Sequence, residues 1–376
     1  METNRMLKLK ELGQSLWLDN IQRSDLTSGK LKDMIDEFGL SGVTSNPTIF
    51  KKAITGGKEY DEQIRELAKK GRSAVEIYDR LTISDIKEAC RIMAEVYNKT
   101  EGNDGFISIE LDPQIAYDTR KSIEEARRLF SEIGSPNMMI KVPGTPEGLS
   151  VVRMLTSEGF NVNVTLLFSP KQYEEVAMAY IEGLEERVAL GKDLSCVNSV
   201  ASFFVSRIDT KVDKQVDYLL EYASDPGVKE GLKRLRGKAA IEIVKVTYGR
   251  FKELFLNPSF KHLKDKGAKV QRPLWASTGT KDPAYSDVKY VDSLIGPYTV
   301  NTLPPATINA FYDHGAVIST LEENMDYSAR ILGEIEVAGI DLERVYKELL
   351  DEGIKAFEES YLELLEALNE RRKGFI

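Results

Sequence analysis

The stretch Met138-Met139-Ile140-Lys141-Val142-Pro143-Gly144 is one of a series of short apolar runs that decide the fold of this chain. It is unusual because it carries a lysine in its middle. Burying an ammonium group is costly unless the charge is paired or lost. A lysine that cannot keep its proton becomes a primary amine, which is a nucleophile. The alternative is a lysine at a strand end whose amine reaches water.

Eight such runs occur along the chain, and helical patterns separate most of them. They are residues 15–20, 42–46, 106–111, 138–142, 161–168, 196–205, 273–277 and 298–301. Continuous apolar runs are typical of strands buried on both faces in a parallel sheet. Eight alternating units predict an α/β fold that closes into a (β/α)8 TIM barrel. A doubly wound open sheet is the alternative, but no Gly-X-Gly-X-X-Gly fingerprint follows the first run.

Several helix ends are marked in the sequence. Thr145-Pro146 and Ser169-Pro170 each provide a cap followed by a proline at the first helical position. Thr27 or Ser28 is expected to cap a helix that ends before Gly39, and residues 115–133 are expected to form a helix that ends before Gly134.

The chain is longer than a barrel alone requires. A minimal barrel needs about 250 residues, whereas this chain has 376. The surplus consists of helical insertions near 51–103 and 208–269 and a helical C-terminal tail after 319, which could cover the barrel bottom, its mouth or a subunit contact. Without a linker rich in Pro, Gly or Ser, we predict one domain over 1–376. The surplus also offers surface for a homodimer.

Composition excludes several classes of function. The net charge of −9 and the absence of a long basic run argue against a nucleic-acid partner. No apolar run approaches the roughly 18–20 residues of a membrane span, and the N-terminus has no apolar signal core. The two cysteines, Cys90 and Cys196, fit a reducing cytoplasm and are expected to be small buried hydrophobes. Two histidines, His262 and His314, show no metal-ligand spacing.

Polar residues gather at the carboxyl ends of the runs, where a parallel barrel builds its active site. They are Asp19, Asn46, Glu110, Lys141, Asn163, Thr165, Ser202, Arg207, Ser277 and Lys281. Each has a structural alternative: Asp19 could cap a helix, and Asn46 could start a turn at Pro47. Together they predict a polar pocket at the barrel mouth.

These residue types suit one kind of chemistry. A neutral lysine amine condenses with a ketone to an iminium, which withdraws electrons and lets a neighbouring carbon–carbon bond break. One carboxylate would take a proton from the hydroxyl whose carbon becomes an aldehyde, and a second would shuttle protons. Amide and hydroxyl groups can hold sugar hydroxyls, and Arg or Lys can bind phosphate.

The motifs around these residues carry a family resemblance from Ser15 to about Phe311. They are LeuTrpLeuAspAsnIle (16–21), GlyValThrSerAsnProThrIlePhe (42–50), SerIleGluLeuAsp (108–112), MetIleLysValProGlyThr (139–145), AsnValThrLeuLeuPheSer (163–169), SerPhePheValSerArgIle (202–208), TrpAlaSerThrGlyThrLys (275–281) and TyrThrValAsnThrLeuProProAlaThr (298–307). With them the chain resembles the transaldolases, in particular the longer bacterial-type branch.

The resemblance implies a single barrel of the class I aldolase type that needs no metal and no organic cofactor. It implies transfer of a dihydroxyacetone unit from sedoheptulose 7-phosphate to glyceraldehyde 3-phosphate. The products are erythrose 4-phosphate and fructose 6-phosphate, as in the non-oxidative pentose phosphate pathway. Sugar phosphates would then be the only ligands required.

The resemblance also implies roles by position. Lys141 matches the Schiff-base lysine, and Asp19 the carboxylate that deprotonates the C4 hydroxyl. Glu110 and Thr165 match the pair that holds a catalytic water. The remaining matches are the groups around the three-carbon fragment, Asn46, Asn163, Ser202 and Phe204, and the phosphate-binding positions Arg207 and Ser277.

One position departs from the family pattern. The shorter branch has a second arginine two residues after the equivalent of Ser277, where this chain has Gly279. Lys281, two residues further on, could bind the phosphate instead. Its ammonium is a point charge and lacks the paired N–H donors of an arginine. The alternative is a solvated loop lysine.

Two other functions remain open at this point. A fructose-6-phosphate aldolase shares the barrel and the lysine but has a non-ionising group in place of Glu110, so Glu110 favours transfer. A non-catalytic barrel that binds sugar phosphates is the third hypothesis.

Overall fold

A computed structural model describes residues 4–375, and residues 1–3 and 376 lie outside this range. That the chain forms one domain stays a prediction. Eight strands in this range form one closed parallel barrel in chain order, which confirms the predicted (β/α)8 fold. The strands are β1 (Gln14–Asp19), β2 (Gly42–Thr44), β3 (Phe106–Glu110), β4 (Met138–Pro143), β5 (Val162–Leu167), β6 (Ser199–Phe204), β7 (Gln271–Ala276) and β8 (Thr299–Leu303). Pairing of β1 with both β2 and β8 closes the sheet.

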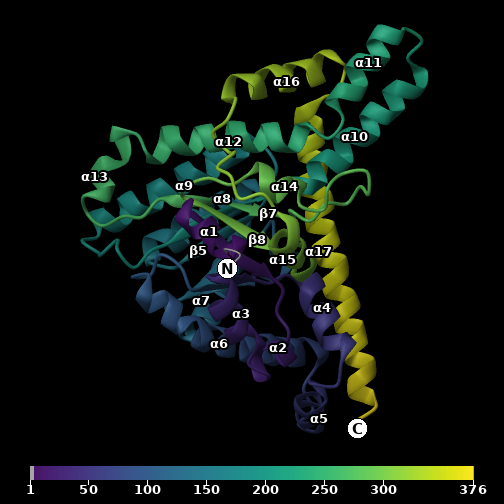
Figure 1. The fold of residues 1–376 in the computed structure, drawn as a ribbon. Helices are drawn as coiled ribbons and strands as arrows, with labels where there is room; N and C mark the ends of the chain where they lie inside the picture. The colour runs from purple at the N-terminus through teal and green to yellow at the C-terminus, as the bar shows by residue number, and fades with distance from the viewer. Residues whose placement is uncertain (1–3, 376) are drawn as a thin grey trace.

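Helices surround the barrel and extend beyond it (Figure 1). They are α1 (Arg5–Glu11), α2 (Arg23–Thr27), α3 (Lys30–Phe38), α4 (Pro47–Gly56), α5 (Asp61–Lys69), α6 (Ala74–Lys99), α7 (Thr119–Ile133), α8 (Pro146–Glu158), α9 (Pro170–Ala189), α10 (Val205–Tyr222), α11 (Pro226–Leu235), α12 (Ala239–Phe255), α13 (Lys261–Lys264), α14 (Lys289–Ser293), α15 (Pro305–His314), α16 (Met325–Val337) and α17 (Leu342–Lys373). Two short 3-10 helices span Pro113–Ile115 and Pro258–Phe260.

The cap signals explain two of the helix starts. Thr145 and Ser169 accept hydrogen bonds from the first turns of α8 and α9, each of which begins with a proline, as predicted. Gly39 and Gly134 end α3 and α7 in the left-handed conformation, which glycine adopts without a steric penalty.

Two predicted helix starts are wrong. Thr27 is the last residue of α2, and Gly29 precedes α3, because a separate short helix occupies residues that we had expected to be a cap. The helix expected from Ile115 begins instead at Thr119. Asp118 accepts a hydrogen bond from the backbone N–H of Lys121 and starts α7 there, after the 3-10 turn.

The long C-terminal helix α17 lies along one side of the molecule, next to α4 (Figure 1). Side chains fasten it to elements far away in the sequence. The hydroxyls of Thr48 and Ser360 lie 2.8 Å apart, Arg371 donates to Asp61 at 2.7 Å, and Lys211 of α10 binds Glu348 at 2.8 Å. The tail is therefore bound to several parts of the barrel wall.

A polar cluster closes the amino-terminal end of the barrel. Asp104 accepts hydrogen bonds from Ser15 at 2.7 Å and from the indole of Trp17 at 3.2 Å, and it pairs with Arg272 at 2.9 Å. Trp17 packs so tightly against Gly42 that a Cβ there would lie 2.4 Å from the ring. In (β/α)8 barrels the active site lies at the opposite, carboxyl-terminal end of the strands.

Two further expectations concern the whole chain. None of the helices among the described residues is both long enough and apolar enough to cross a lipid bilayer. Cys90 is buried, as expected, but Cys196 is exposed because it lies in a surface turn before β6.

Candidate active site

Lys141 lies in β4 with its side chain 4% exposed. Its Nζ donates a hydrogen bond to the backbone carbonyl of Ser45 at 3.1 Å and lies 3.4 Å from Oε2 of Glu110. Glu110 faces Lys141 because the two residues are partners in the register of β3 and β4. The amine is thus buried among groups that two neighbouring strands supply.

Glu110 is the second ionisable group of this pair, with a side chain 7% exposed. At 3.4 Å the contact is an ion pair longer than a normal hydrogen bond, and Oε2 accepts no hydrogen bond from the described residues. Burial raises the pKa of Glu110, whereas Lys141 lowers it and the nearby carboxylate of Asp19 raises it further. A carboxyl group in this setting can both take up and release a proton.

Asp19 ends β1, and its Oδ1 accepts a hydrogen bond from Thr44 at 2.8 Å. The hydroxyl of Thr44 also lies 2.8 Å from that of Thr302. Burial raises the pKa of Asp19, although the positive charge of Lys141 lowers it. Sequence reasoning did not select Thr44 and Thr302. Both could have been found from their positions, since each lies near the carboxyl end of a predicted strand.

Asn163 and Ser202 belong to a buried chain of hydrogen bonds. Ser202 donates to Oδ1 of Asn163 at 2.6 Å, and Nδ2 of Asn163 donates to the hydroxyl of Ser108 at 3.0 Å. Ser108 was also missed, although it precedes Glu110 by two residues and therefore faces the same side of β3. The structure brings these predicted residues together across β3, β5 and β6.

Thr165 faces the same side of β5 as Asn163, two residues earlier. It is fully buried, and its hydroxyl has no hydrogen-bond partner among the described residues. Buried hydroxyl groups are normally bonded to protein or to ordered water. An unbonded hydroxyl at this end of the barrel is suited to holding a water or substrate.

Asn46 has a structural function that is separate from the others. Its side chain accepts a hydrogen bond from the backbone N–H of Ile49 at 2.9 Å and caps α4. Asn46 therefore has a structural role at Pro47, where it starts a helix. Its contact with substrate stays a prediction.

Phe204 and Arg207 lie together at the start of α10. The guanidinium carbon of Arg207 is 5.1 Å from the centre of the Phe204 ring. Burial lowers the pKa of Arg207, and the negative charges of Asp19, Glu352 and Glu110 raise it. Glu352 is itself bound by Lys211. Arg207 thus presents a positive charge close to the carboxylates of the candidate site.

Ser277 follows β7 with a φ of 55°, in the left-handed region. Its hydroxyl is 3.1 Å from that of Ser206, and its carbonyl accepts from the Ser206 N–H at 3.0 Å. Ser277 is therefore held against the helix that carries Arg207.

Lys281 is exposed, and its charge lowers the pKa of Asp19. The loop around it is fixed: Thr278 donates to Asn301 at 3.0 Å, and Asp282 pairs with Arg236 at 3.0 Å. A Cβ at Gly279 would lie 3.2 Å from the hydroxyl of Thr307, so a larger residue there is crowded. The role of Lys281 in phosphate binding stays a prediction to be tested.

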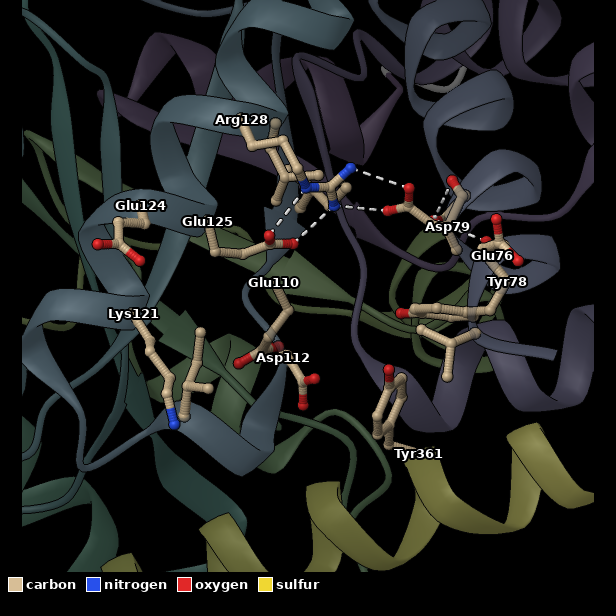
Figure 2. A pocket seen from close by; sticks show the side chains of 15 residues that line it. Glu76, Tyr78, Asp79, Glu110, Asp112, Lys121, Glu124, Glu125, Arg128 and Tyr361 are labelled. Atoms are coloured by element: carbon tan, nitrogen blue, oxygen red, sulfur yellow. Dashed lines mark hydrogen bonds and ion pairs between the residues drawn. The ribbon is translucent and has the colours of Figure 1, made fainter. Parts of the chain in front are cut away.

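A cavity of about 500 Å³ borders the site on the outer side of β3. Figure 2 shows Glu110 and Asp112 next to each other in it, with Tyr361 of α17 nearby and Arg128 held by Asp79 and Glu125. Of the predicted site residues, only Glu110 lines this cavity. The cavity therefore adjoins the candidate site, but the predicted site residues do not converge in it.

The fold and this cluster define a (β/α)8 barrel with a lysine and two carboxyl groups at the carboxyl ends of its strands. A family described as Transaldolase/Fructose-6-phosphate aldolase matches residues 16–368. A Transaldolase from Trichodesmium erythraeum is 48% identical over 375 residues, covering 99% of both chains. Transaldolase 2 from Nostoc punctiforme (46%) and Transaldolase from Saccharopolyspora erythraea (44%) also cover 99% of both chains.

The chain therefore belongs to the transaldolase and fructose-6-phosphate aldolase family of enzymes. The family expected from the motifs is confirmed, over nearly the whole chain. The roles of the individual site residues stay predictions.

Proposed function

We propose that the protein transfers a dihydroxyacetone unit from sedoheptulose 7-phosphate to glyceraldehyde 3-phosphate through a Schiff base on Lys141. The observation that carries this proposal is the pairing of the buried Lys141 amine with Glu110 at 3.4 Å. Loss of the lysine proton yields the nucleophilic amine, and a carboxyl group next to it can receive that proton.

The reaction follows from the groups at hand. The amine adds to the C2 ketone and water leaves, which gives an iminium. Asp19 takes the proton of the C4 hydroxyl, the C3–C4 bond breaks, and its electrons form an enamine while the aldose departs as an aldehyde. The enamine then attacks the acceptor aldehyde, whose oxygen takes the proton back from Asp19. Water adds to the iminium formed in this way, which releases the ketose and restores the amine. Glu110 and Thr165 would hold the water used in the first and last steps.

The substrate contacts are part of the same proposal. Asn163 and Ser202, together with Asn46 and Phe204, would surround the three-carbon fragment. Arg207, Ser277 and Lys281 would bind the phosphate, for which a positive charge and fixed hydroxyl groups are suitable partners.

Borohydride reduction in the presence of fructose 6-phosphate tests the Schiff base. We expect a mass increment on the tryptic peptide that contains Lys141, and none in Lys141→Ala. A wild-type enzyme without this increment would contradict the proposal. A release of free dihydroxyacetone from fructose 6-phosphate that is equally fast with and without glyceraldehyde 3-phosphate would instead favour the aldolase.

The setting of the enzyme is also a proposal. We propose that it acts in the cytoplasm, within the non-oxidative pentose phosphate pathway, and as a homodimer. Light scattering after size-exclusion chromatography measures the oligomeric state directly, and a monomer mass would contradict the dimer.

A further inference from the structure

Leu166 has a backbone conformation that leucine rarely adopts. Its φ is 63°, in the left-handed region, and it directly follows Thr165. The register between β5 and β6 shifts between Val164 and Leu167. Such bulges often occur next to active sites, where they redirect a side chain. This bulge lies beside the threonine whose buried hydroxyl is unbonded within the described residues.

The side chain of Gln172 holds the bulge. Its Oε1 accepts from the N–H of Phe168 at 2.9 Å, and its Nε2 donates to the carbonyls of Leu166 at 3.2 Å and Gly144 at 2.7 Å. One amide group thus bonds three backbone groups at the ends of β4 and β5. These are the strands that carry Lys141 and Thr165.

The local sequence predicts that Gln172 belongs to a capping box, but the structure does not contain one here. Ser169 caps α9 and Gln172 is three residues later, the spacing of a capping box. In a capping box the Gln side chain would bond the N–H of Ser169. Here it bonds the N–H of the preceding residue, Phe168, and reaches across to β4.

Two further contacts restrict the same segment. The N–H of Gly144 donates to the carbonyl of Thr165 at 2.8 Å, so the two strand ends are also joined directly. A Cβ at Gly353 of α17 would lie 2.8 Å from Cδ2 of Leu166, so α17 packs closely against the side chain that follows Thr165. The backbone around Thr165 is therefore held by Gln172 and Gly144, with α17 against the neighbouring Leu166.

We propose that Gln172 is a positioning residue that fixes the hydroxyl of Thr165 relative to Lys141. The inference rests on the proposed function, because it assigns Thr165 to the water used in iminium formation and hydrolysis. Gln172 touches no reacting atom and acts through the backbone of the bulge. Its loss should slow the water-dependent steps while leaving the binding of the sugar phosphate unchanged.

The test is a double-mutant cycle on the rate at which borohydride with fructose 6-phosphate inactivates the enzyme. We expect Gln172→Leu to lower this rate about tenfold, the scale of a small misplacement of a reacting group, with KM unchanged. In a Thr165→Ala background the same substitution should have no further effect. Lys171→Leu, which alters the exposed neighbour on α9, is the matched control.

The outcomes separate the two proposals. If the effects of Gln172→Leu and Thr165→Ala multiply, or if Gln172→Leu behaves like Lys171→Leu, Gln172 does not act through Thr165. If Gln172→Leu fails to fold, Gln172→Glu replaces it, since it keeps the acceptor for Phe168 and loses both donated bonds. A wild-type enzyme that is not inactivated contradicts the proposed function itself, and this inference with it.

Discussion

The Nζ of Lys141 and Oε2 of Glu110 lie 3.4 Å apart, and both side chains are almost completely buried. Because no other lysine of the predicted site is buried, Lys141→Ala should abolish turnover and leave no species that borohydride can trap. Burial already raises the pKa of Glu110, so Glu110 can take up a proton when its partner is removed. The variant should therefore remain folded by circular dichroism. Lys171→Ala, at an exposed position of α9, should retain full activity.

Replacement of Asp19 should slow carbon–carbon cleavage without preventing formation of the Schiff base. Asp19→Ala should still form the trapped adduct but slow carbon–carbon cleavage by about 10²–10⁴-fold, the usual contribution of a positioned base. Single-turnover release of the aldose measures the cleavage step. Asp36→Ala, an exposed position on α3, is the control. A variant that cannot be trapped would show that Asp19 acts before cleavage.

The role proposed for Glu110 concerns the water used to form and hydrolyse the iminium. Glu110→Gln should slow both iminium formation and iminium hydrolysis, by about 10²–10⁴-fold for lost proton transfer. It should also raise cleavage to free dihydroxyacetone relative to transfer. Parallel assays with and without glyceraldehyde 3-phosphate measure this ratio. If neither rate changes, Glu110 does not belong to the site.

The activity should fall at acid pH. Asp19 must be ionised to accept a proton, and burial raises its pKa above the ordinary value. The acid limb of the kcat/KM profile should therefore lie above pH of about 4, the usual range for aspartate. A profile that stays flat down to that pH would contradict the role of Asp19 as base.

The same pKa shift has a consequence for stability. A carboxyl group whose pKa is raised in the folded state binds more protons there than in the unfolded chain. The folded state therefore loses stability as pH rises towards that pKa, and the loss is complete above it. The Tm of Asp19→Asn relative to wild type should accordingly increase with pH. Thermal melts at several pH values check this, and a constant difference would argue against burial as the cause.

The phosphate site can be tested by charge removal. Arg207→Met and Lys281→Met should each raise KM for glyceraldehyde 3-phosphate by about tenfold or more, the scale of a lost charge-assisted bond. The effect should be larger for Arg207, which is more buried. With unphosphorylated glyceraldehyde as acceptor and a saturating donor, the KM for the acceptor should match wild type in both variants. Lys192→Met, in the exposed turn before β6, is the control for a general charge effect.

The sequence was sufficient for the barrel because strand-length apolar runs and cap signals are local. Met138 and Phe106 start strands where the pattern predicts them. Parallel strands also bring their carboxyl ends to one side, so Glu110 and Lys141 could be expected at the same end of the barrel. The helix starts near Thr27 and Ile115 were wrong because a short separate helix ends at Thr27 and because Asp118 caps α7 after a 3-10 turn.

The rest of the site depends on contacts that no local pattern contains. The carbonyl of Ser45 reaches Lys141 only because of the register between strands. Leu166 is left-handed, but neither it nor its neighbours in ThrLeuLeuPheSer (165–169) are glycine or asparagine, so these residues do not indicate its conformation. Gly353 lies far along the chain, and only the packing of α17 brings it to Leu166.

The contact between Gly353 and Leu166 has a consequence for biosynthesis. The ribosome releases the strand bearing Lys141 long before it releases α17. A chain that stops before α17 can already form the strand with Lys141, but it lacks the helix that packs against Leu166, the residue after Thr165. We therefore expect the surroundings of Thr165 to be completed only after α17 has been made.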